Sequence, residues 1–399
     1  MAQLTAVLDI GSSKVICMIA GMDNRDGLTV RGAGVREYQG YENGKLTDPA
    51  SLQEAIFDAV ALAEGEARHR VRIVSVGVPA SFTKLVLHRG EVVPRARSRR
   101  ISERDIDELI NASMDFKPPE GYELIHSTPV DFTVDGTAHG EMPIGMQAEK
   151  LSGTVSHVYV EENFKDTVAK ALLRIGLDAD MYIAVPLSEG LFVIPEALRA
   201  KPAILVDVGA KNTDVSVMRN AALVASRTIP VGGAHFSGDL GYGLGVEASV
   251  AETLKRRYVY SREYQDSIDT VHLPGGETMR VEHEAIRYIV EARTQELASL
   301  IADAAKEMGA PLSGKPALYL TGGGITLMRG SCEFMEKCLG VPVEVRMPTM
   351  PRLSTPNYAS AFSVMEFVMH ATDDAMPDER SSRASNGNLI NKLKNLFVN

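Results

Sequence analysis

The sequence predicts an α/β protein built from two similar lobes that face each other across a cleft. Two observations carry this prediction. The segment Leu8–Lys14 (LDIGSSK) is repeated in Val206–Asn212 (VDVGAKN), which places Asp9 and Asp207 198 residues apart. The 399 residues exceed one ordinary core, and 45% apolar with 24% charged residues is typical of a globular chain. A duplicated fold accounts for both the length and the repeat.

Charge and cysteine content narrow the classes of protein. With 42 Lys and Arg against 52 Asp and Glu, the net charge is −10, which argues against a protein that neutralises many duplex phosphates. The three cysteines, Cys17, Cys332 and Cys338, lack metal-ligand spacing and predict reduced thiols in the cytoplasm. No basic N-terminal region precedes an apolar stretch, and no uncharged apolar run reaches the about 18 residues of a membrane span. We expect neither export nor a transmembrane helix.

Residues 1–80 predict the first part of one lobe core. Apolar runs at 4–10, 15–20 and 28–35, separated by Gly-containing turns, indicate three antiparallel strands. A helix then begins near Pro49, because apolar residues recur every three or four positions from Leu52 onward. A buried strand at 71–78 follows.

Residues 81–157 differ in character and predict an inserted α+β subdomain. We expect a helix that Ser102 caps, with Asp105 completing a capping box, and that runs to about Met114. A strand at 123–134 and a turn at 143–146 complete the segment. We interpret the crowded arginines before the helix as a solvated edge rather than a binding site; they are Arg95, Arg97, Arg99 and Arg100.

The rest of the chain completes this lobe and then repeats it. A helix at 164–175 and a strand at 181–185 return to the first core within 158–200. Strands at 203–209, 213–219 and 221–229 repeat the opening meander within 201–245. Three further units are predicted: a smaller subdomain with a long helix from Ile286 to Ala304 (246–312), a second piece of the core with a strand at 317–320 (313–355), and a helix that returns to the first lobe (356–370).

The repeated hairpins carry the chemistry. Asp9 and Asp207 each end a buried strand, and a glycine turn follows at Gly11 and Gly209. Glycine lets backbone N–H groups approach a phosphate, and a carboxylate at the strand end can hold water ligands of Mg²⁺. Two such hairpins facing each other would grip a nucleotide tail from both sides. Hydroxyl donors and a cation are added by Ser12, Ser13 and Lys14.

Two later motifs would enclose a nucleoside. Thr321-Gly322-Gly323-Gly324 follows a buried strand and precedes a helical stretch, so its backbone can lie flat against a nucleoside with a helix N-terminus nearby. Glu252, Lys255 and Arg256 share one helix face. Taken alone, each hairpin is usually a simple turn and the charged trio a surface ion pair. Their combination favours a nucleotide site.

The order of these motifs resembles the two phosphate motifs and the adenosine pocket of the superfamily of actin, sugar kinases and DnaK chaperones. Over nearly its whole length the chain resembles the FtsA family of bacterial cell-division proteins. Further residues that carry this resemblance are 43–48 (NGKLTD), 124–136 (LIHSTPVDFTVDG), 143–146 (PIGM) and 230–233 (PVGG). The insert at 81–157 is similar to the subdomain that distinguishes this family from actin. An actin-like (ribonuclease H-like) duplicated fold, with two lobes around a nucleotide cleft, is implied.

The resemblance also implies ligands and partners. ATP and Mg²⁺ would bind in the cleft, and the protein would polymerise into filaments. It would bind the C-terminal peptide of the tubulin-like FtsZ through the smaller subdomain, around Gly245 to Leu312, and tether FtsZ to the cytoplasmic side of the cell membrane at the division septum. The inserted subdomain would contact other divisome proteins.

Site residues are implied position by position. Phosphate contacts fall on Asp9, Gly11, Ser12, Ser13, Lys14, Asp207, Gly209, Lys211 and Asn212. Asp9 and Asp207 would hold Mg²⁺ through water; Glu252, Lys255 and Arg256 would flank adenine and ribose, and Gly322, Gly323 and Gly324 would bound the nucleoside.

The second hairpin departs from the family pattern, because it has Ala210-Lys211 where many superfamily members have glycine. These side chains narrow the approach of phosphate, although Lys211 can compensate with charge. We expect at most slow ATP hydrolysis and assign no catalytic residue.

The C-terminus predicts a tethered membrane helix. Residues 371–387 have almost no apolar content and are expected to be a disordered linker. In 388–399, apolar residues fall on one helical face with a lysine on either side; the set is Leu389, Ile390, Lys392, Leu393, Lys394, Leu396 and Phe397. So short a helix is marginal in water and would fold on a membrane surface. Its weak affinity would need many tails on one polymer.

Two other functions share this fold. One is an actin-like membrane scaffold of a pilus or secretion machine, and the other is a small-molecule kinase, which would require a carboxylate in the cleft as general base. The sequence lacks the Gly-x-x-x-x-Gly-Lys-Ser/Thr, His-Glu-x-x-His and Gly-x-Ser-x-Gly motifs, which disfavours a P-loop ATPase, a zinc protease and an α/β-hydrolase.

Overall fold

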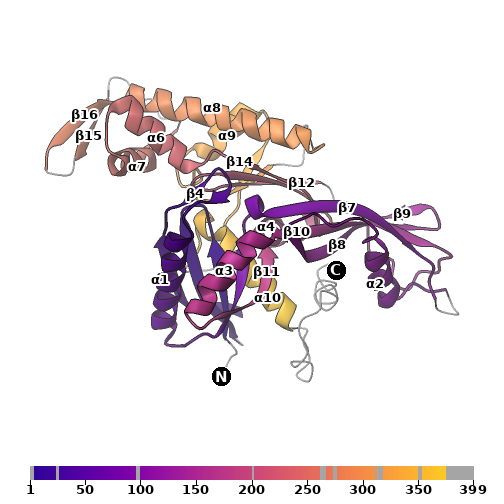
Figure 1. The fold of residues 1–399 in the computed structure, drawn as a ribbon. Coiled ribbons are helices and arrows are strands. Elements are labelled where there is room, and N and C mark those ends of the chain that lie inside the picture. The colour runs from indigo at the N-terminus through magenta and orange to yellow at the C-terminus, as the bar shows by residue number, and fades with distance from the viewer. Residues whose placement is uncertain are drawn as a thin grey trace.

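The computed structural model describes residues 4–23, 27–95, 99–199, 202–260, 267–272, 276–310, 312, 318–348 and 353–373. Two lobes lie one above the other, and a third unit extends from the side of the lower one (Figure 1). The predicted membrane helix and nearly all of the predicted linker lie outside the described residues. Within them, no helix is both long and apolar enough to cross a membrane.

The first lobe is a five-stranded sheet covered by helices. Its strand order is β11-β6-β1-β2-β3, with β1 and β6 parallel and the β1-β2-β3 meander antiparallel. Asp48 caps α1 by accepting from the N–H groups of Ala50 and Ser51, and the helix packs on β2 and β3. The bounds are β1 Leu4–Ile10, β2 Lys14–Asp23, β3 Gly27–Glu37, α1 Pro49–Ala67, β6 Ile73–Val78, α3 Glu162–Arg174 and β11 Asp178–Ala184, with short strands β4 Tyr41–Glu42 and β5 Lys45–Leu46.

The second lobe repeats this sheet strand for strand, which confirms the duplicated actin-like fold. Its order is β18-β17-β12-β13-β14, again with one antiparallel meander and parallel strands beside it. The bounds are β12 Ala203–Val208, β13 Thr213–Arg219, β14 Ala222–Ile229, β17 Leu318–Thr321 and β18 Val343–Val345. Helices and a hairpin at the top of Figure 1 complete the lobe: α6 Gly233–Leu244, α7 Ala248–Arg257, β15 Ile268–His272, β16 Thr278–Glu282, α8 His283–Glu307 and α9 Ser331–Leu339.

The insert is a four-stranded antiparallel sheet, β7-β10-β8-β9, with one helix. Its elements are η1 Ala80–Phe82, β7 Thr83–Val92, α2 Glu103–Ala112, β8 Tyr122–Val134, β9 Thr137–His139 and β10 Leu151–Glu161. The capping box is present, since the N–H of Ser102 donates to Asp105 Oδ2 at 2.8 Å. Sequence reasoning missed β7 and β10. In β10, the polar residues Ser156 and His157 interrupt the apolar pattern, yet both are buried and hydrogen-bonded.

Two helices join the lobes. The helix α4 Val185–Phe192 packs on α10 Ala359–Asp373 and on β13 and β14 of the second lobe. Sequence reasoning missed α4 and the four-residue α5 Glu196–Arg199, because the apolar run at 181–185 continues directly into α4. A short turn, η2 Pro356–Tyr358, leads directly into α10. The helix α10 extends three residues into the segment that we expected to be a linker.

Candidate nucleotide-binding cleft

The hairpins of the two lobes meet at a cavity of about 530 Å³. Every residue that sequence reasoning assigned to phosphate, metal, adenosine or the nucleoside edge lines this cavity. They come from four segments that are far apart in the chain: the turn after β1, the turn after β12, the helix α7, and the glycines after β17. The structure therefore brings the predicted site residues together.

The two hairpins have the same local geometry. The N–H of Gly11 donates to the carbonyl of Lys14 at 2.9 Å, and the N–H of Gly209 donates to the carbonyl of Asn212 at 2.9 Å. Each bond closes a tight turn directly after the aspartate. The hairpins differ in the strand opposite, because Ile16 pairs with Asp9, whereas Asp214 pairs with Asp207. The second hairpin thus carries one more carboxylate.

Negative charge is concentrated at the floor of the cavity. We call four of the acidic residues that line the cavity its floor: Asp9, Glu189, Asp207 and Asp214. Burial, followed by the charges of Asp214 and Asp9, raises the pKa of Asp207 to about 7. Burial also raises the pKa of Asp9, although a hydrogen bond from Ser360 and the charge of Lys14 partly offset this. The site therefore favours a bound cation.

Lys14 is the cation whose charge lowers the pKa of both Asp9 and Asp207. Its ammonium donates to the carbonyl of Asn357 at 3.3 Å and lies 5.3 Å from the ring centroid of Tyr358. Burial lowers its pKa, and the carboxylates of Asp9 and Asp207 oppose that shift. The ammonium of Lys14 therefore interacts with the aspartates of both hairpins.

Several cavity residues were not predicted. Ser360 at the start of α10 donates to Asp9 Oδ2 at 2.6 Å, and Tyr38 donates to the carbonyl of Gly11 at 2.8 Å. Glu189 in α4, Asp214 in β13 and Asn357 in η2 also line the cavity. The pairing of Asp214 with Asp207 could have been found by aligning the two repeats. The others come from single residues without a motif, and their placement depends on tertiary packing.

The charged face of α7 closes the cavity on the side of the second lobe. Glu252 accepts from Lys255 Nζ at 2.6 Å and from Arg256 Nε at 2.7 Å, as their helical spacing predicts. Ser237 of α6 adds a hydrogen bond to Glu252 at 2.5 Å. Burial alone would raise the pKa of Glu252, but the hydrogen bonds from Lys255, Ser237 and Arg256 outweigh it, so the pKa is lowered. Glu252 is a firmly ionised anchor for two cations.

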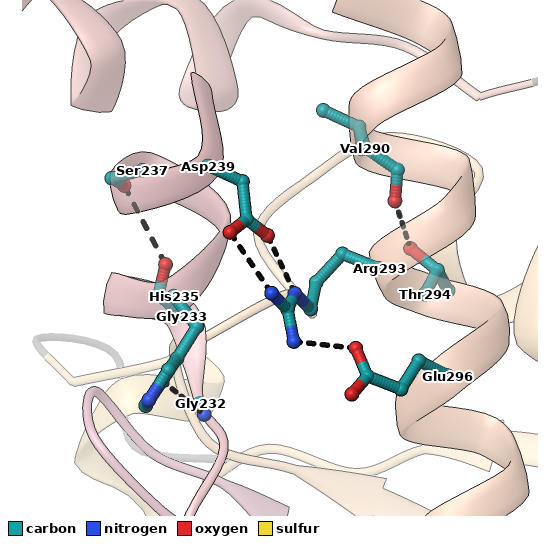
Figure 2. A network of polar contacts seen from close by, with 9 residues as sticks. All are labelled: Gly232, Gly233, His235, Ser237, Asp239, Val290, Arg293, Thr294 and Glu296. Carbon is teal, nitrogen blue, oxygen red and sulfur yellow. Dashed lines mark hydrogen bonds and ion pairs between the residues drawn. The ribbon is translucent and has the colours of Figure 1, made fainter. Parts of the chain in front are cut away.

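The helices α6 and α8 hold this face in place. Figure 2 shows Arg293 of α8 reaching across to Asp239 of α6, with both nitrogen–oxygen contacts drawn. The distances are 2.5 Å from Nε to Oδ2 and 2.9 Å from Nη2 to Oδ1. At the start of α6, His235 Nδ1 accepts from the N–H of Gly232 at 3.0 Å. A bidentate pair of this kind fixes both distance and orientation between the helices.

The glycines after β17 are required by close backbone contacts. At Gly322, φ is +83°, and a Cβ would lie 2.0 Å from Asp207 Oδ1. A Cβ on Gly324 would lie 2.5 Å from the carbonyl oxygen of Gly209. The glycine segment therefore packs directly against the second hairpin.

One detail of the expectation for this segment was wrong. No helix begins at the glycines, since α9 starts only at Ser331. The helix N-terminus that lies against them is that of α6, where a Cβ on Gly233 would meet Gly324 at 2.7 Å. Its first N–H groups are already used, because Gly233 and Ala234 donate to the carbonyls of Gly209 and Ala210 at 2.9 and 2.7 Å.

The residues at the floor fit a hydrated divalent cation. Carboxylate oxygens are the ligands that Mg²⁺ prefers, and it usually keeps several waters. One oxygen, Glu189 Oε1, is buried without a hydrogen-bond partner among the described residues. Within the same residues, no three acidic, His or Cys side chains gather closely enough to hold a metal ion directly. Two carboxylates acting through water, Asp9 and Asp207, suit such an ion.

Comparison with known proteins identifies the family. Residues 204–363 match the model described as cell division protein FtsA, and residues 83–159 match the SHS2 domain inserted in FtsA. Together these matches cover more than half of the chain. The FtsA of Neisseria meningitidis serogroup B is 26% identical over 99% of this chain and 98% of its own length. The FtsA of Pseudomonas aeruginosa is 24% identical over 92% of this chain and 90% of its own.

Solved structures share the fold. A PilM–PilN type IV pilus biogenesis complex aligns with a TM-score of 0.61 at 18% identity, over 90% of this chain and 97% of that chain. MreB5 of Spiroplasma citri bound to ADP aligns with a TM-score of 0.55 at 11% identity, over 94% and 99%. At these identities the likeness concerns the fold alone. The family models and the full-length relatives show that this chain belongs to the FtsA family of bacterial cell-division proteins.

Proposed function

We propose that this chain is an ATP-binding division protein that polymerises on the membrane and tethers FtsZ. The observation that carries the nucleotide part is the convergence of both acidic hairpins, the α7 face and the glycine segment on one cavity. These four segments offer what phosphates, a cation and a nucleoside each require. Structures of MreB5 with ADP and with AMPPNP, which share this fold, support a nucleotide as the ligand class.

Each group of residues has a distinct task in this proposal. Lys14 and the hairpin N–H groups would contact the phosphates, and Lys211 would add a cation from the second lobe. Asp9 and Asp207 would hold the water ligands of Mg²⁺, with Ser360 orienting Asp9. The bound ion would neutralise phosphate charge. Lys255 and Arg256, fixed by Glu252, would flank adenine and ribose.

The membrane part of the proposal rests on the sequence of the tail. The described chain ends in α10, which starts at the cleft and leads toward the predicted linker. The amphipathic pattern of 388–399 supports peripheral attachment at the cytoplasmic side of the membrane. A filament would present many such tails together and make the attachment stable.

The FtsZ part concerns the smaller subdomain, where two neighbouring helices, α6 and α8, each carry an exposed tyrosine. Asp239 contacts Arg293, and a Cβ on Gly243 would meet Ile289, so α6 and α8 run antiparallel. In that register Tyr242 and Tyr288 fall on the same side of the helix pair. They are 94% and 76% exposed. Exposed tyrosines favour binding of a peptide, so this surface supports a contact with the C-terminal peptide of FtsZ.

Two binding experiments test these parts. Full-length protein should co-sediment with vesicles of phosphatidylglycerol, and a variant ending at residue 387 should stay in solution while still binding ATP.

The FtsZ C-terminal peptide should bind the wild-type protein and fail to bind the double variant Tyr242→Ala/Tyr288→Ala. The control Phe57→Ala, which removes an exposed aromatic side chain of α1, should have no effect on peptide binding. Equal affinity of the peptide for wild type and for the double variant would contradict the docking surface. If the wild-type protein does not bind FtsZ at all, a pilus or secretion scaffold would be favoured. Rapid turnover on adding a sugar would favour a kinase.

A further inference from the structure

One carboxyl group in the cleft lacks a structural explanation. Glu189 lies in α4, lines the cavity and is 3% exposed, yet its Oε1 has no hydrogen-bond partner among the described residues. A buried carboxylate without a partner costs free energy. Such a group persists where function requires it, and perturbed buried acids in clefts are candidates for catalysis.

The other carboxyl groups of the cavity have defined roles or are solvated. Both oxygens of Asp214 are occupied, by Thr228 at 2.5 Å and by Asn212 at 3.0 Å. Asp9 accepts from Ser360, and Glu252 holds two cations. Glu37 is exposed to solvent. Asp207 is the partner of Asp9 in the proposed cation site. Glu189 is therefore the buried acid with an oxygen left to act.

Packing fixes Glu189 at the junction of the lobes. The next residue, Gly190, lies so close to β13 that a Cβ would be 2.3 Å from the sulfur of Met218. The flanking Ser188 is fully buried and donates to the carbonyl of Val185 at 3.1 Å. The carboxyl is thus held on a rigid helix that contacts both lobes, where any shift between them also shifts Glu189 relative to the hairpins.

We infer that Glu189 is a catalytic residue whose carboxylate accepts a proton from the water that attacks the terminal phosphate of a bound nucleoside triphosphate. The inference rests on the proposed nucleotide site. A bond forms between the water oxygen and the γ-phosphorus, and the bond from that phosphorus to the β,γ-bridging oxygen breaks. Its electron pair leaves with the nucleoside diphosphate. The proton on Glu189 then passes to the released phosphate.

The surroundings of Glu189 suit a proton acceptor. Burial, followed by the charges of Asp207, Asp9 and Asp214, raises its pKa. A raised pKa means that the carboxyl group holds a proton more tightly than an exposed glutamate does. Its low exposure also keeps bulk water away from the reacting atoms.

The test separates turnover from binding in the full-length protein. A fluorescent mant-ATP probe measures affinity, and phosphate release under single-turnover conditions measures hydrolysis. Glu189→Gln keeps the shape but cannot accept the proton, so it should slow hydrolysis about a hundredfold while the mant-ATP affinity changes less than threefold. The matched control is Glu64→Gln, a buried glutamate of α1 that is held by Arg70 and the N–H of Val71 and does not line the cavity. Its hydrolysis rate should equal that of wild type.

The possible results separate a failure of the proposed nucleotide site from a failure of the catalytic role of Glu189. Failure of wild type to bind mant-ATP would overturn the proposed nucleotide site itself. Normal binding with no hydrolysis in wild type, or equal rates in wild type and Glu189→Gln, would overturn the role of Glu189 alone. Weaker binding at an unchanged rate would also overturn it. If Glu189→Gln does not fold, Glu189→Asp, which withdraws the carboxylate by one methylene, should slow hydrolysis at least tenfold, and an unchanged rate would contradict the inference.

Discussion

The backbone N–H of Lys211 in the second lobe donates to the hydroxyl of Ser12 in the first lobe at 3.0 Å. The ammonium of the same lysine donates to the carbonyl of Tyr41 at 2.9 Å, again across the cleft. The residue that departs from a glycine hairpin therefore ties the lobes together. A phosphate that enters the cleft must compete with these bonds or make use of the same groups.

We expect Lys211→Ala to loosen the lobes in the absence of nucleotide. Losing one bond across the cleft should lower the free energy of unfolding by about 1 kcal/mol. Chemical denaturation measures the change. Lys150→Ala is the control, because its ion pair with Glu91 is exposed and should contribute less than about 0.5 kcal/mol. Equal effects of both variants would show that Lys211 does not hold the lobes.

Gly322→Ala should damage the cation site rather than the fold alone. Its Cβ would collide with Asp207 Oδ1, so Asp207 must move, and Mg²⁺-dependent ATP affinity should fall at least tenfold. Gly340→Ala separates the cost of backbone strain, because Gly340 has a φ of +67° but no atom within 4 Å of its Cβ. That variant should lose about 1 kcal/mol of stability and bind ATP as wild type does. Titration calorimetry measures both affinities.

Ser360→Ala should weaken cation binding without harming the fold. Without the hydroxyl, Asp9 loses the bond that orients it, and Mn²⁺ affinity, measured by electron paramagnetic resonance, should fall about threefold to tenfold, or about 1 kcal/mol. The matched control is Ser363→Ala one turn later, where the hydroxyl donates to the carbonyl of Ala359 within α10. A loss that is the same in both variants would contradict a role of Ser360 in positioning Asp9.

Stability without metal should depend on pH through Asp207. Its pKa is raised to about 7 in the folded protein, so the folded state binds the proton more tightly than the unfolded state. The resulting stability is fully present below about pH 4 and is lost as pH rises through about 7. Asp207→Asn removes this dependence. In EDTA, its free energy of unfolding relative to wild type should therefore increase between pH 5 and pH 8, and a constant difference would contradict the assignment.

The duplicated fold and the cleft could be predicted from the sequence because both depend on short local motifs. The two Asp-x-Gly hairpins, the i, i+3, i+4 trio of Glu252 and the glycines after β17 are each short motifs with a physical reason for their spacing. The order of these motifs along the chain was enough to predict that they line one cavity.

The remaining residues depend on tertiary packing. Glu189 follows an apolar strand with no signal of its own, and Ser360 reaches Asp9 only because α10 crosses back to the first lobe. The strand β10 was missed because buried polar residues such as His157 disrupt its pattern. Ser113 and Ser127, which satisfy that histidine, lie 44 and 30 residues away in sequence.

We propose above all that the hairpins of Asp9 and Asp207 share one triphosphate and its divalent ion. Isothermal titration calorimetry of ATP into the full-length protein, with Mg²⁺ and with EDTA, measures whether they do. We expect one ATP site per chain whose affinity requires Mg²⁺ and falls at least tenfold in both Asp9→Asn and Asp207→Asn. An ATP affinity that is the same with Mg²⁺ and with EDTA, or that is unchanged in either aspartate variant, would contradict a shared site.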